Sequence, residues 1–434
     1  MIVNENSFDW LKNREDNSID HIITDPPYLI DFMGKGWDSE DNIAGSVDFW
    51  KETLRVCKSG SYALVFGHSR THHRVMVAME NAGWEIRDCL MWVQGQGFPK
   101  SHELGAKIDK ALGHIGHRGK RVKHQVGQEH LEKPEAVGRH EPISEEAKEW
   151  SGWGENLKPA WEAIIMARKP FKGSLTNNVL TNKLGALNID ACRVGNETNP
   201  QKVITTKGAK FKSWSDDPEK TRWHNQGFNK LGGNTYETKE TTGRFPANII
   251  LDEEAGKLLD EQAPKTGNAF KSKRKKDTSG GSGNSWTNGG KEEGEDNGIY
   301  DGLSGASKFF YCPKVSSKER NFGCENLPQR QTIGGGGTET DIAGAYGSVK
   351  AKSGNHHPTL KPIELMKWLV KLVSIEGQVI LDPFTGSGST GIAVELLGRE
   401  FIGVELDPDY CEIAKARINA WKEKENNTLD EQSE

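Results

Sequence analysis

The chain has 434 residues, a net charge of −5 and 27% charged residues, a length that allows a large core and two domains. It has no apolar run of about 18 residues, and its start lacks a basic region followed by a hydrophobic stretch, which argues against membrane insertion and secretion. The six cysteines form no CxxC pair, as expected for reduced thiols, so we expect a cytoplasmic protein.

The first candidate site follows a short apolar segment near the start of the chain. Residues 21–24 predict a buried strand, and Asp25, Pro26, Pro27 and Tyr28 come directly after it. Two prolines end a strand because they lack an N–H donor and fix φ. The Asp25 carboxylate and the Pro26 carbonyl can then accept hydrogen bonds from an amino group on a flat heterocycle, against which the Tyr28 ring can stack. An ordinary strand-ending turn is the alternative, because Asp-Pro pairs often begin turns.

The loop after this tetrad, residues 30–38, is a first candidate for phosphate contact. Its glycines permit motion, Lys35 can meet a phosphate, and Phe32 or Trp37 can cover a base. The alternative is an ordinary loop pinned by its aromatic residues.

A polar insertion is predicted at 102–155, where several histidines lie among many Lys, Arg and Glu residues. His114 and His117 have an HxxH spacing that occurs in zinc sites. No cysteine joins them, so we prefer a mobile polar surface segment and predict that the protein has no metal site.

The middle of the chain, about 173–352, is rich in glycine and carries a net positive charge. Two short apolar runs, 187–190 and 248–251, predict strands. A basic run at 271–276 can lie along phosphates, with a solvated disordered loop as the alternative. The basic residues of this run are Lys271, Lys273, Arg274, Lys275 and Lys276.

The second candidate site lies toward the end of the chain. An apolar strand ends at Asp382, Gly386 and Gly388 form a tight loop, and a helical pattern follows. A second apolar strand then ends at Glu405. A strand, a glycine loop, a helix, a strand and an acid form a half-site for a nucleoside cofactor, because the acid can accept both ribose hydroxyls.

The spacing Gly386-x-Gly388-x-x-Gly391 also fits a dinucleotide-binding fingerprint, which makes an NAD enzyme an alternative. Too few residues follow Gly391 to complete a dinucleotide-binding sheet in this half. Asp382 would also repel a pyrophosphate and suits a cationic cofactor, so we favour the latter.

Together the two segments resemble the permuted-order (beta-type) amino DNA methyltransferases, in which a DPPY catalytic motif precedes an FxGxG motif that binds S-adenosylmethionine (AdoMet). The resemblance covers roughly residues 1–172 and 353–425. It implies that the catalytic residues are Asp25, Pro26, Pro27 and Tyr28. It implies that the cofactor-binding residues are Asn6, Thr359, Lys361, Asp382, Pro383, Phe384, Gly386, Gly388 and Glu405.

Two of these assignments come from particular segments. Residues 357–362, His-Pro-Thr-Leu-Lys-Pro, match the family segment that closes over the methionine end of the cofactor. Asn6 stands where the family usually has an aspartate that contacts the adenine amino group of AdoMet. Its side-chain oxygen can still accept a hydrogen bond.

The resemblance implies an α/β fold: a Rossmann-like, AdoMet-dependent methyltransferase sheet with helices on both faces. Residues 1–172 and 353–425 would form one discontinuous catalytic domain, and 173–352 an inserted target-recognition region. Residues 426–434 are expected to be a disordered acidic tail.

The resemblance also implies a reaction, which is methylation of N6 of adenine in a short duplex DNA sequence after base flipping. In the family, an acidic first residue of the motif occurs mostly in enzymes that methylate adenine, and a serine occurs mostly in enzymes that methylate N4 of cytosine. Methylation of N4 of cytosine is therefore the alternative. An RNA adenine methyltransferase is a weaker alternative. Lys35 and the basic run would contact DNA. Double-stranded DNA is the expected partner, with a cognate restriction endonuclease and a homodimer as further expectations.

Overall fold

The structure is a computed structural model that describes residues 1–30, 42–95, 103–114, 142–205, 235–262, 307, 310–311, 319–331 and 352–433. Within these residues eight strands form the central sheet: β1 (Ile2–Asn4), β2 (His21–Thr24), β3 (Tyr62–His68), β4 (Glu85–Val93), β5 (Trp161–Arg168), β8 (Ile249–Leu251), β11 (Val379–Asp382) and β12 (Glu400–Glu405). Their order is β1-β12-β11-β2-β3-β5-β4-β8. Of these strands, β5 runs antiparallel to its neighbours, and the other neighbouring pairs are parallel.

The two ends of the chain meet in the middle of this sheet. β11 lies between β12 and β2, and Leu381 of β11 pairs with Ile22 of β2. An acid marks the end of each strand: Asp382 is the last residue of β11, and Asp25 follows β2. Because parallel neighbours end at the same edge of a sheet, the two predicted motifs lie together at that edge.

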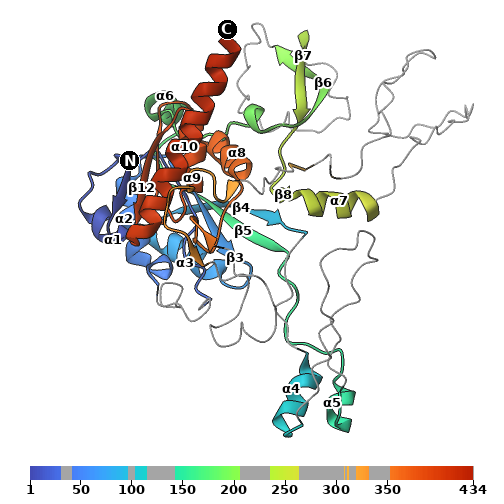
Figure 1. The fold of residues 1–434 in the computed structure, drawn as a ribbon. Helices are drawn as coiled ribbons and strands as arrows, with labels where there is room; N and C mark the ends of the chain where they lie inside the picture. The colour runs from blue at the N-terminus through green and yellow to red at the C-terminus, as the bar shows by residue number, and fades with distance from the viewer. Residues whose placement is uncertain are drawn as a thin grey trace, which may run out of the picture.

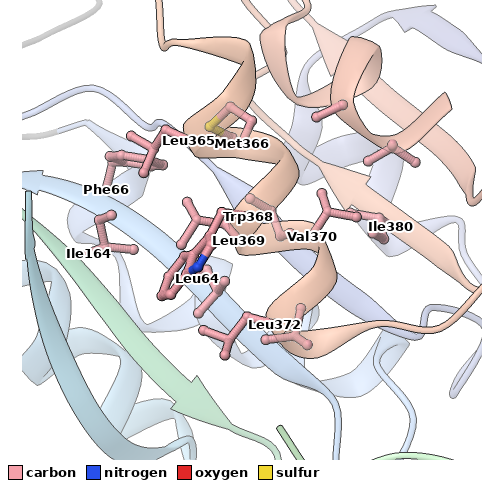
Figure 2. Close-up of a cluster of buried hydrophobic side chains, with 14 of the residues drawn as sticks. Leu64, Phe66, Ile164, Leu365, Met366, Trp368, Leu369, Val370, Leu372 and Ile380 are labelled. Atoms are coloured by element: carbon pink, nitrogen blue, oxygen red, sulfur yellow. The ribbon is translucent and has the colours of Figure 1, made fainter. Parts of the chain in front are cut away.

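Helices cover both faces of the sheet, as the sequence predicted. One face carries α8 (Ile363–Val373), α9 (Ser389–Leu396) and α10 (Pro408–Ser433), and the other carries α1 (Ser7–Lys12), α2 (Val47–Val56) and α3 (His72–Ala82). Figure 2 shows the first face, where Leu369 of α8 lies near Leu64 of β3. The next residue of β3, Val65, packs on the opposite face. Burial on both faces explains why these strands are continuous apolar runs.

The covering helices form where apolar residues recur every three or four positions. In α2 the buried residues are Phe49, Trp50, Thr53 and Val56, which lie on one side of a helix. α3 ends at Gly83, which has a φ of 105°. Glycine adopts this left-handed conformation without strain, so Gly83 ends the helix.

Part of the predicted recognition region belongs to the central sheet. The apolar run at 248–251 forms β8, which pairs with β4 at the sheet edge, so this strand prediction is confirmed. Tyr311 forms an isolated bridge to Ile250 and stacks on Trp368 of α8, with ring centroids 5.3 Å apart. These contacts tie the middle of the chain to the core.

The run at 187–190 does not form a strand, and that prediction is wrong. Asp190–Cys192 form a short 3₁₀ helix, η4, and Asn188 Oδ1 accepts a hydrogen bond from Ala191 N at 3.3 Å. Asn188 N donates to the Leu372 carbonyl of α8 at 2.8 Å. The backbone of this segment therefore bonds to a turn and a helix instead of a neighbouring strand.

The remaining elements lie around this core (Figure 1). β6 (Val194–Thr205) and β7 (Thr235–Arg244) form an antiparallel pair, and α4 (Leu104–Ala111) packs on α5 (Glu145–Glu149) away from the sheet. The others are η3 (Ile43–Gly45), α6 (Leu175–Asn182), α7 (Glu253–Gln262), and the paired strands β9 (Arg330–Gln331) and β10 (Lys352–Ser353).

The end of the chain differs from the prediction of a disordered tail from residue 426. α10 continues to Ser433, so the backbone of 426–433 is helical. No glycine or proline follows Pro408 in the sequence, and a run rich in Glu, Lys and Ala favours a helix. Neither α10 nor any other helix in the described part of the chain is long and apolar enough to cross a membrane.

Candidate active site

A cavity of about 980 Å³ lies where β2, β11 and β12 end. Both predicted motifs contribute to its wall. The predicted site residues that line it are Asn6, Asp25, Pro26, Pro27, Tyr28, Thr359, Lys361, Asp382, Pro383, Phe384, Gly386 and Glu405. This volume is at the upper end of the range for small-molecule sites, so a nucleoside cofactor and a base can share the cavity.

Asp25 presents its two carboxylate oxygens differently. Oδ2 accepts a hydrogen bond from Lys361 Nζ at 2.7 Å. Oδ1 is buried and has no hydrogen-bond partner among the described residues. A buried acceptor without a partner costs about 1–3 kcal/mol. Asp25 lines the cavity, and its Oδ1 is the carboxylate oxygen left to accept from an N–H donor of a ligand.

Tyr28 is fixed at both its hydroxyl and its backbone. Its hydroxyl donates to Glu162 Oε2 at 2.7 Å and accepts from Lys361 Nζ at 2.9 Å. Its carbonyl accepts from Thr71 Oγ1 at 2.5 Å. The next residue, Leu29, is buried with a φ of 58°, a left-handed conformation that strains a bulky residue. The core thus holds the backbone after the tetrad in a conformation that it would otherwise avoid.

Lys361 lies in the catalytic half of the cavity, although the sequence predicted it at the methionine end of the cofactor. Its ammonium contacts Asp25, Tyr28 and, at 3.1 Å, Glu162 Oε2. The side chain is 7% exposed. An ammonium has three donors, so this arrangement supplies an acceptor for each of them.

Burial and charge shape the ionisation of this cluster. Burial raises the pKa of Asp25, although the Lys361 ammonium opposes that shift. Burial and the two nearby carboxylates raise the pKa of Tyr28 well above its usual value. Burial alone would raise the pKa of Glu162 and lower that of Lys361. The Lys361 ammonium and several hydrogen bonds lower the pKa of Glu162 instead, and the carboxylates of Asp25 and Glu162 raise the pKa of Lys361. Tyr28 is therefore neutral, and Lys361 and Glu162 are both charged.

Glu405 holds the glycine loop through backbone donors. Its Oε2 accepts from Gly386 N at 2.8 Å and its Oε1 from Asp407 N at 2.9 Å. Burial raises the pKa of Glu405, and these two bonds oppose the rise. Because a carboxylate has about four acceptor positions, Glu405 can still accept from a ligand hydroxyl.

Asp382 joins the two halves of the cavity. Its Oδ1 accepts from Thr24 Oγ1 of β2 at 2.6 Å and from Phe384 N at 3.1 Å. Burial raises the pKa of Asp382 to about 6. The carboxylate therefore fixes the start of the glycine loop against the strand that carries Asp25.

The glycine loop leaves room that a side chain would fill. Gly386 has a φ of 52°, and a Cβ there would lie 2.8 Å from His357 Nε2. Gly388 has a φ of 79° and packs on Ala414 of α10 instead of lining the cavity. An open loop, an acid for ribose hydroxyls and several carboxylates around one lysine fit a cationic nucleoside cofactor such as AdoMet.

The segment before α8 and the start of α1 add polar groups to this half. His357 Nδ1 lies 2.7 Å from the Thr359 carbonyl oxygen and 3.4 Å from Thr359 N. Burial lowers the pKa of His357 to about 4.

Asn6 lines the cavity, but its Oδ1 caps α1 by accepting from Phe8 N at 2.9 Å. The oxygen predicted to bind the cofactor adenine therefore already serves the helix.

Some predicted contacts lie outside the described residues. These are Lys35 and the basic run of Lys271, Lys273, Arg274, Lys275 and Lys276, together with His117. Within the described ranges, no group of three or more His, Cys, Asp or Glu side chains is arranged to hold a metal ion.

Glu162 is the residue of this site that sequence reasoning did not single out. It stands at the second position of β5, just before the apolar run of residues 163–167. Gln94 Nε2 donates to its Oε1 at 2.7 Å. The lone acid in a buried strand was the available signal, because buried carboxylates are rare unless they are paired.

The comparison with known families agrees with this site. The model of the N6/N4 methyltransferases, described as DNA methylase, matches residues 19–416. That range is most of the chain and includes both motifs, and the protein belongs to this family.

Individual relatives match shorter segments. The chain is 45% identical over 67 residues to the type II methyltransferase M2.DpnII of Streptococcus pneumoniae, which covers 15% of this chain and 25% of that protein. It is 28% identical over 228 residues to the type II methyltransferase M.HindIII of Haemophilus influenzae, covering 43% and 64%. These matches thus span from a quarter to just under two thirds of the relatives.

Among solved structures, the cytosine-N4-specific PvuII DNA methyltransferase aligns with 99% of this chain and 92% of its own. The sequence identity is 12% and the TM-score is 0.39.

Proposed function

We propose that the protein transfers a methyl group from AdoMet to N6 of adenine in a short sequence of double-stranded DNA. One observation carries the proposal: Asp25, whose Oδ1 is a buried acceptor without a partner in the described residues, lines the same cavity as the Glu405 loop. An amino group can complete Asp25 while the cofactor occupies the other half. We further propose the permuted, beta-type motif order, because Asp25 precedes Gly386 in the chain.

AdoMet, when bound, supplies an electrophilic methyl group on a positively charged sulfur. Glu405 would accept from its ribose hydroxyls, and the lack of a side chain at Gly386 would let the cofactor approach the loop backbone. Phe384 and Asp382 would line the same half. Family membership and the chemistry of these residues support this assignment.

The chain's own residues would act on the target amine. An aromatic amine is a poor nucleophile because its lone pair is delocalised into the ring. Asp25 Oδ1 and the Pro26 carbonyl would accept its two N–H bonds, orient it and favour a pyramidal nitrogen. Tyr28 would stack on the flipped base, and flipping costs a few kcal/mol. The ionised Asp25 would also stabilise positive charge as it develops on the nitrogen.

Adenine is favoured over cytosine because the tetrad begins with an acid, as in most adenine-specific members of the family. Residues 173–352 would supply sequence recognition, with the residues that pack on the sheet anchoring that region. A cognate endonuclease and a homodimer are compatible with this assignment.

The proposal is tested by expressing the chain in a methylation-free bacterial host and mapping modified bases by long-read sequencing, beside an Asp25→Ala control. We expect one short motif methylated on adenine and a loss of about 100-fold or more in the control. Modified cytosine in place of modified adenine would show that the enzyme methylates N4 of cytosine. Absence of any DNA mark, with AdoMet binding intact, would overturn the DNA assignment.

A further inference from the structure

The cluster around Lys361 holds more buried charge than a structural role explains. Lys361 Nζ lies 2.7 Å from Asp25 Oδ2 and 3.1 Å from Glu162 Oε2. Tyr28 bonds to both Lys361 and Glu162, and Gln94 bonds to the other oxygen of Glu162. Buried ion pairs contribute little to stability, because desolvation offsets their attraction. This cluster also lines the cavity instead of the core.

We propose that Lys361 and Glu162 are positioning residues that act through Asp25 and Tyr28 on the target amino group. The inference rests on the proposed function, and it moves Lys361 from the cofactor to the target side of the reaction.

The geometry assigns Lys361 two tasks. By donating to Asp25 Oδ2 it fixes the carboxylate and leaves Oδ1 as the acceptor for the amine. By donating to the Tyr28 hydroxyl, which itself donates to Glu162, it fixes the plane of the ring on which the base would stack. Glu162 orients the ammonium for both tasks, and Gln94 holds Glu162.

The charges of the cluster assign Lys361 and Glu162 opposite effects on Asp25. Lys361 favours the ionised carboxylate and Glu162 disfavours it. With all three groups ionised the cluster carries a net charge of about −1, which suits an amine that becomes positive as it is methylated. Among the described residues, the ionisable groups near Asp25 are Lys361 before α8, Glu162 on β5, Tyr28 on its own loop and Asp382 on β11, with His68 of β3 against the Tyr28 ring.

These opposite effects give a direct test. Initial rates of methyl transfer to unmethylated genomic DNA are measured from about pH 5 to pH 9 with saturating tritiated AdoMet. Activity needs the Asp25 carboxylate, so it falls as the pH drops through the pKa of Asp25. Lys361→Met removes a positive charge, so the acidic limb should move to higher pH. Glu162→Gln removes a negative charge, so the limb should move to lower pH.

Turnover at the pH optimum should fall about 10- to 100-fold in Lys361→Met, the loss expected for a hydrogen bond to a charged group. Lys367→Met is the matched control. Lys367 lies on α8 and pairs with Glu364 at 3.0 Å on the helix surface. This control should leave both turnover and the pH limb unchanged.

A second readout needs neither DNA nor catalysis. The carboxyl of Asp25 is titrated by NMR in protein labelled with ¹³Cγ-aspartate, with Asp25→Asn used to assign the signal. The two variants should shift this titration in opposite directions, and AdoMet affinity should stay within about threefold of the wild type.

Two results would overturn the inference. Titrations of Asp25 that coincide in all three proteins would remove its electrostatic basis. A Lys361→Met protein that loses AdoMet binding, with the Asp25 titration unmoved, would make Lys361 a cofactor ligand. A wild-type protein that methylates no DNA at any pH would instead reject the proposed function, while the NMR titration still decides the roles of Lys361 and Glu162.

Discussion

The two halves of the cavity hold their acids in different ways. In the cofactor half, both oxygens of Glu405 accept from backbone N–H groups, Gly386 and Asp407. In the catalytic half, Asp25 has one oxygen on a lysine side chain, and its other oxygen lacks a partner in the described structure. Both acids stand at the ends of parallel strands, β12 and β2, on either side of β11, yet their surroundings give them different chemistry.

The first arrangement suits binding of a ligand, and the second suits a group that takes part in a reaction. Backbone donors build a loop that is preformed, so little ordering is needed when a ligand enters. A side-chain cluster leaves an acceptor open and keeps its charge adjustable, which is what a reacting group requires. We therefore expect changes in the first half to alter cofactor affinity and changes in the second to alter turnover.

The largest effect on the cofactor half is expected from Gly386→Ala. A Cβ there would lie 2.8 Å from His357 Nε2, and the φ of 52° is strained for alanine. The Kd for AdoMet, measured by calorimetry, should rise about 100-fold, in line with roughly 3 kcal/mol of strain and lost contact. Turnover at saturating AdoMet should change little. A large loss of turnover with normal affinity would break the division between the halves.

A second prediction concerns the pairing of β2 with β11, at the start of both strands. His21 of β2 is buried, accepts from Tyr62 N at 3.1 Å and lies 3.2 Å from Gln378 Oε1, beside β11. Burial lowers its pKa to about 4. The unfolded chain takes up this proton near pH 6.5 but the folded chain does not, so stability falls as the pH drops from about 6.5 to 4, by roughly 3 kcal/mol.

This loss is measured by urea unfolding at pH 7.5 and pH 4.5. His21→Gln should be less stable at pH 7.5 because it alters two buried bonds, yet it should lose less stability on acidification. An identical acid-induced loss in wild type and variant would show that His21 does not titrate as described.

The smallest effect is expected from Tyr28→Phe, which sharpens the account of the catalytic half. The variant keeps the stacking ring and removes the hydroxyl that bonds Glu162 and Lys361. Turnover should fall about tenfold, as for one hydrogen bond to a charged group, with the Kd for AdoMet unchanged. Tyr28→Ala should be much less active. Equal losses in both variants would mean that the hydroxyl, and not the ring, carries the function of Tyr28.

The core of the site was predictable from the sequence because its signals are local. A buried strand followed by an acid, two prolines and a tyrosine, and a second strand followed by an acid and glycines, each fit within a few residues. The placement of Asp25 near Asp382 then followed from the rule that parallel strands end at one edge. The helices on both faces of the sheet were predicted from the resemblance to the amino DNA methyltransferases.

The remaining parts depend on contacts between distant residues. Glu162 and Lys361 have no spacing that relates them, and only the folded sheet brings them together. The capping role of Asn6, whose oxygen accepts from the backbone at the start of α1, depends on where that helix begins. The run at 187–190 has strand composition, but Asn188 and α8 satisfy its backbone.

The most direct test of the two-half account compares Asp25→Asn with Glu405→Gln, which remove one charge each from the two strand ends on either side of β11 with little change in shape. AdoMet affinity is measured by calorimetry and methyl transfer to unmethylated DNA by tritium incorporation at saturating cofactor. Asp25→Asn should lose at least about 100-fold in turnover and keep its affinity, whereas Glu405→Gln should bind AdoMet about tenfold more weakly and keep most of its turnover. Equal losses of affinity and turnover in both variants would contradict the account.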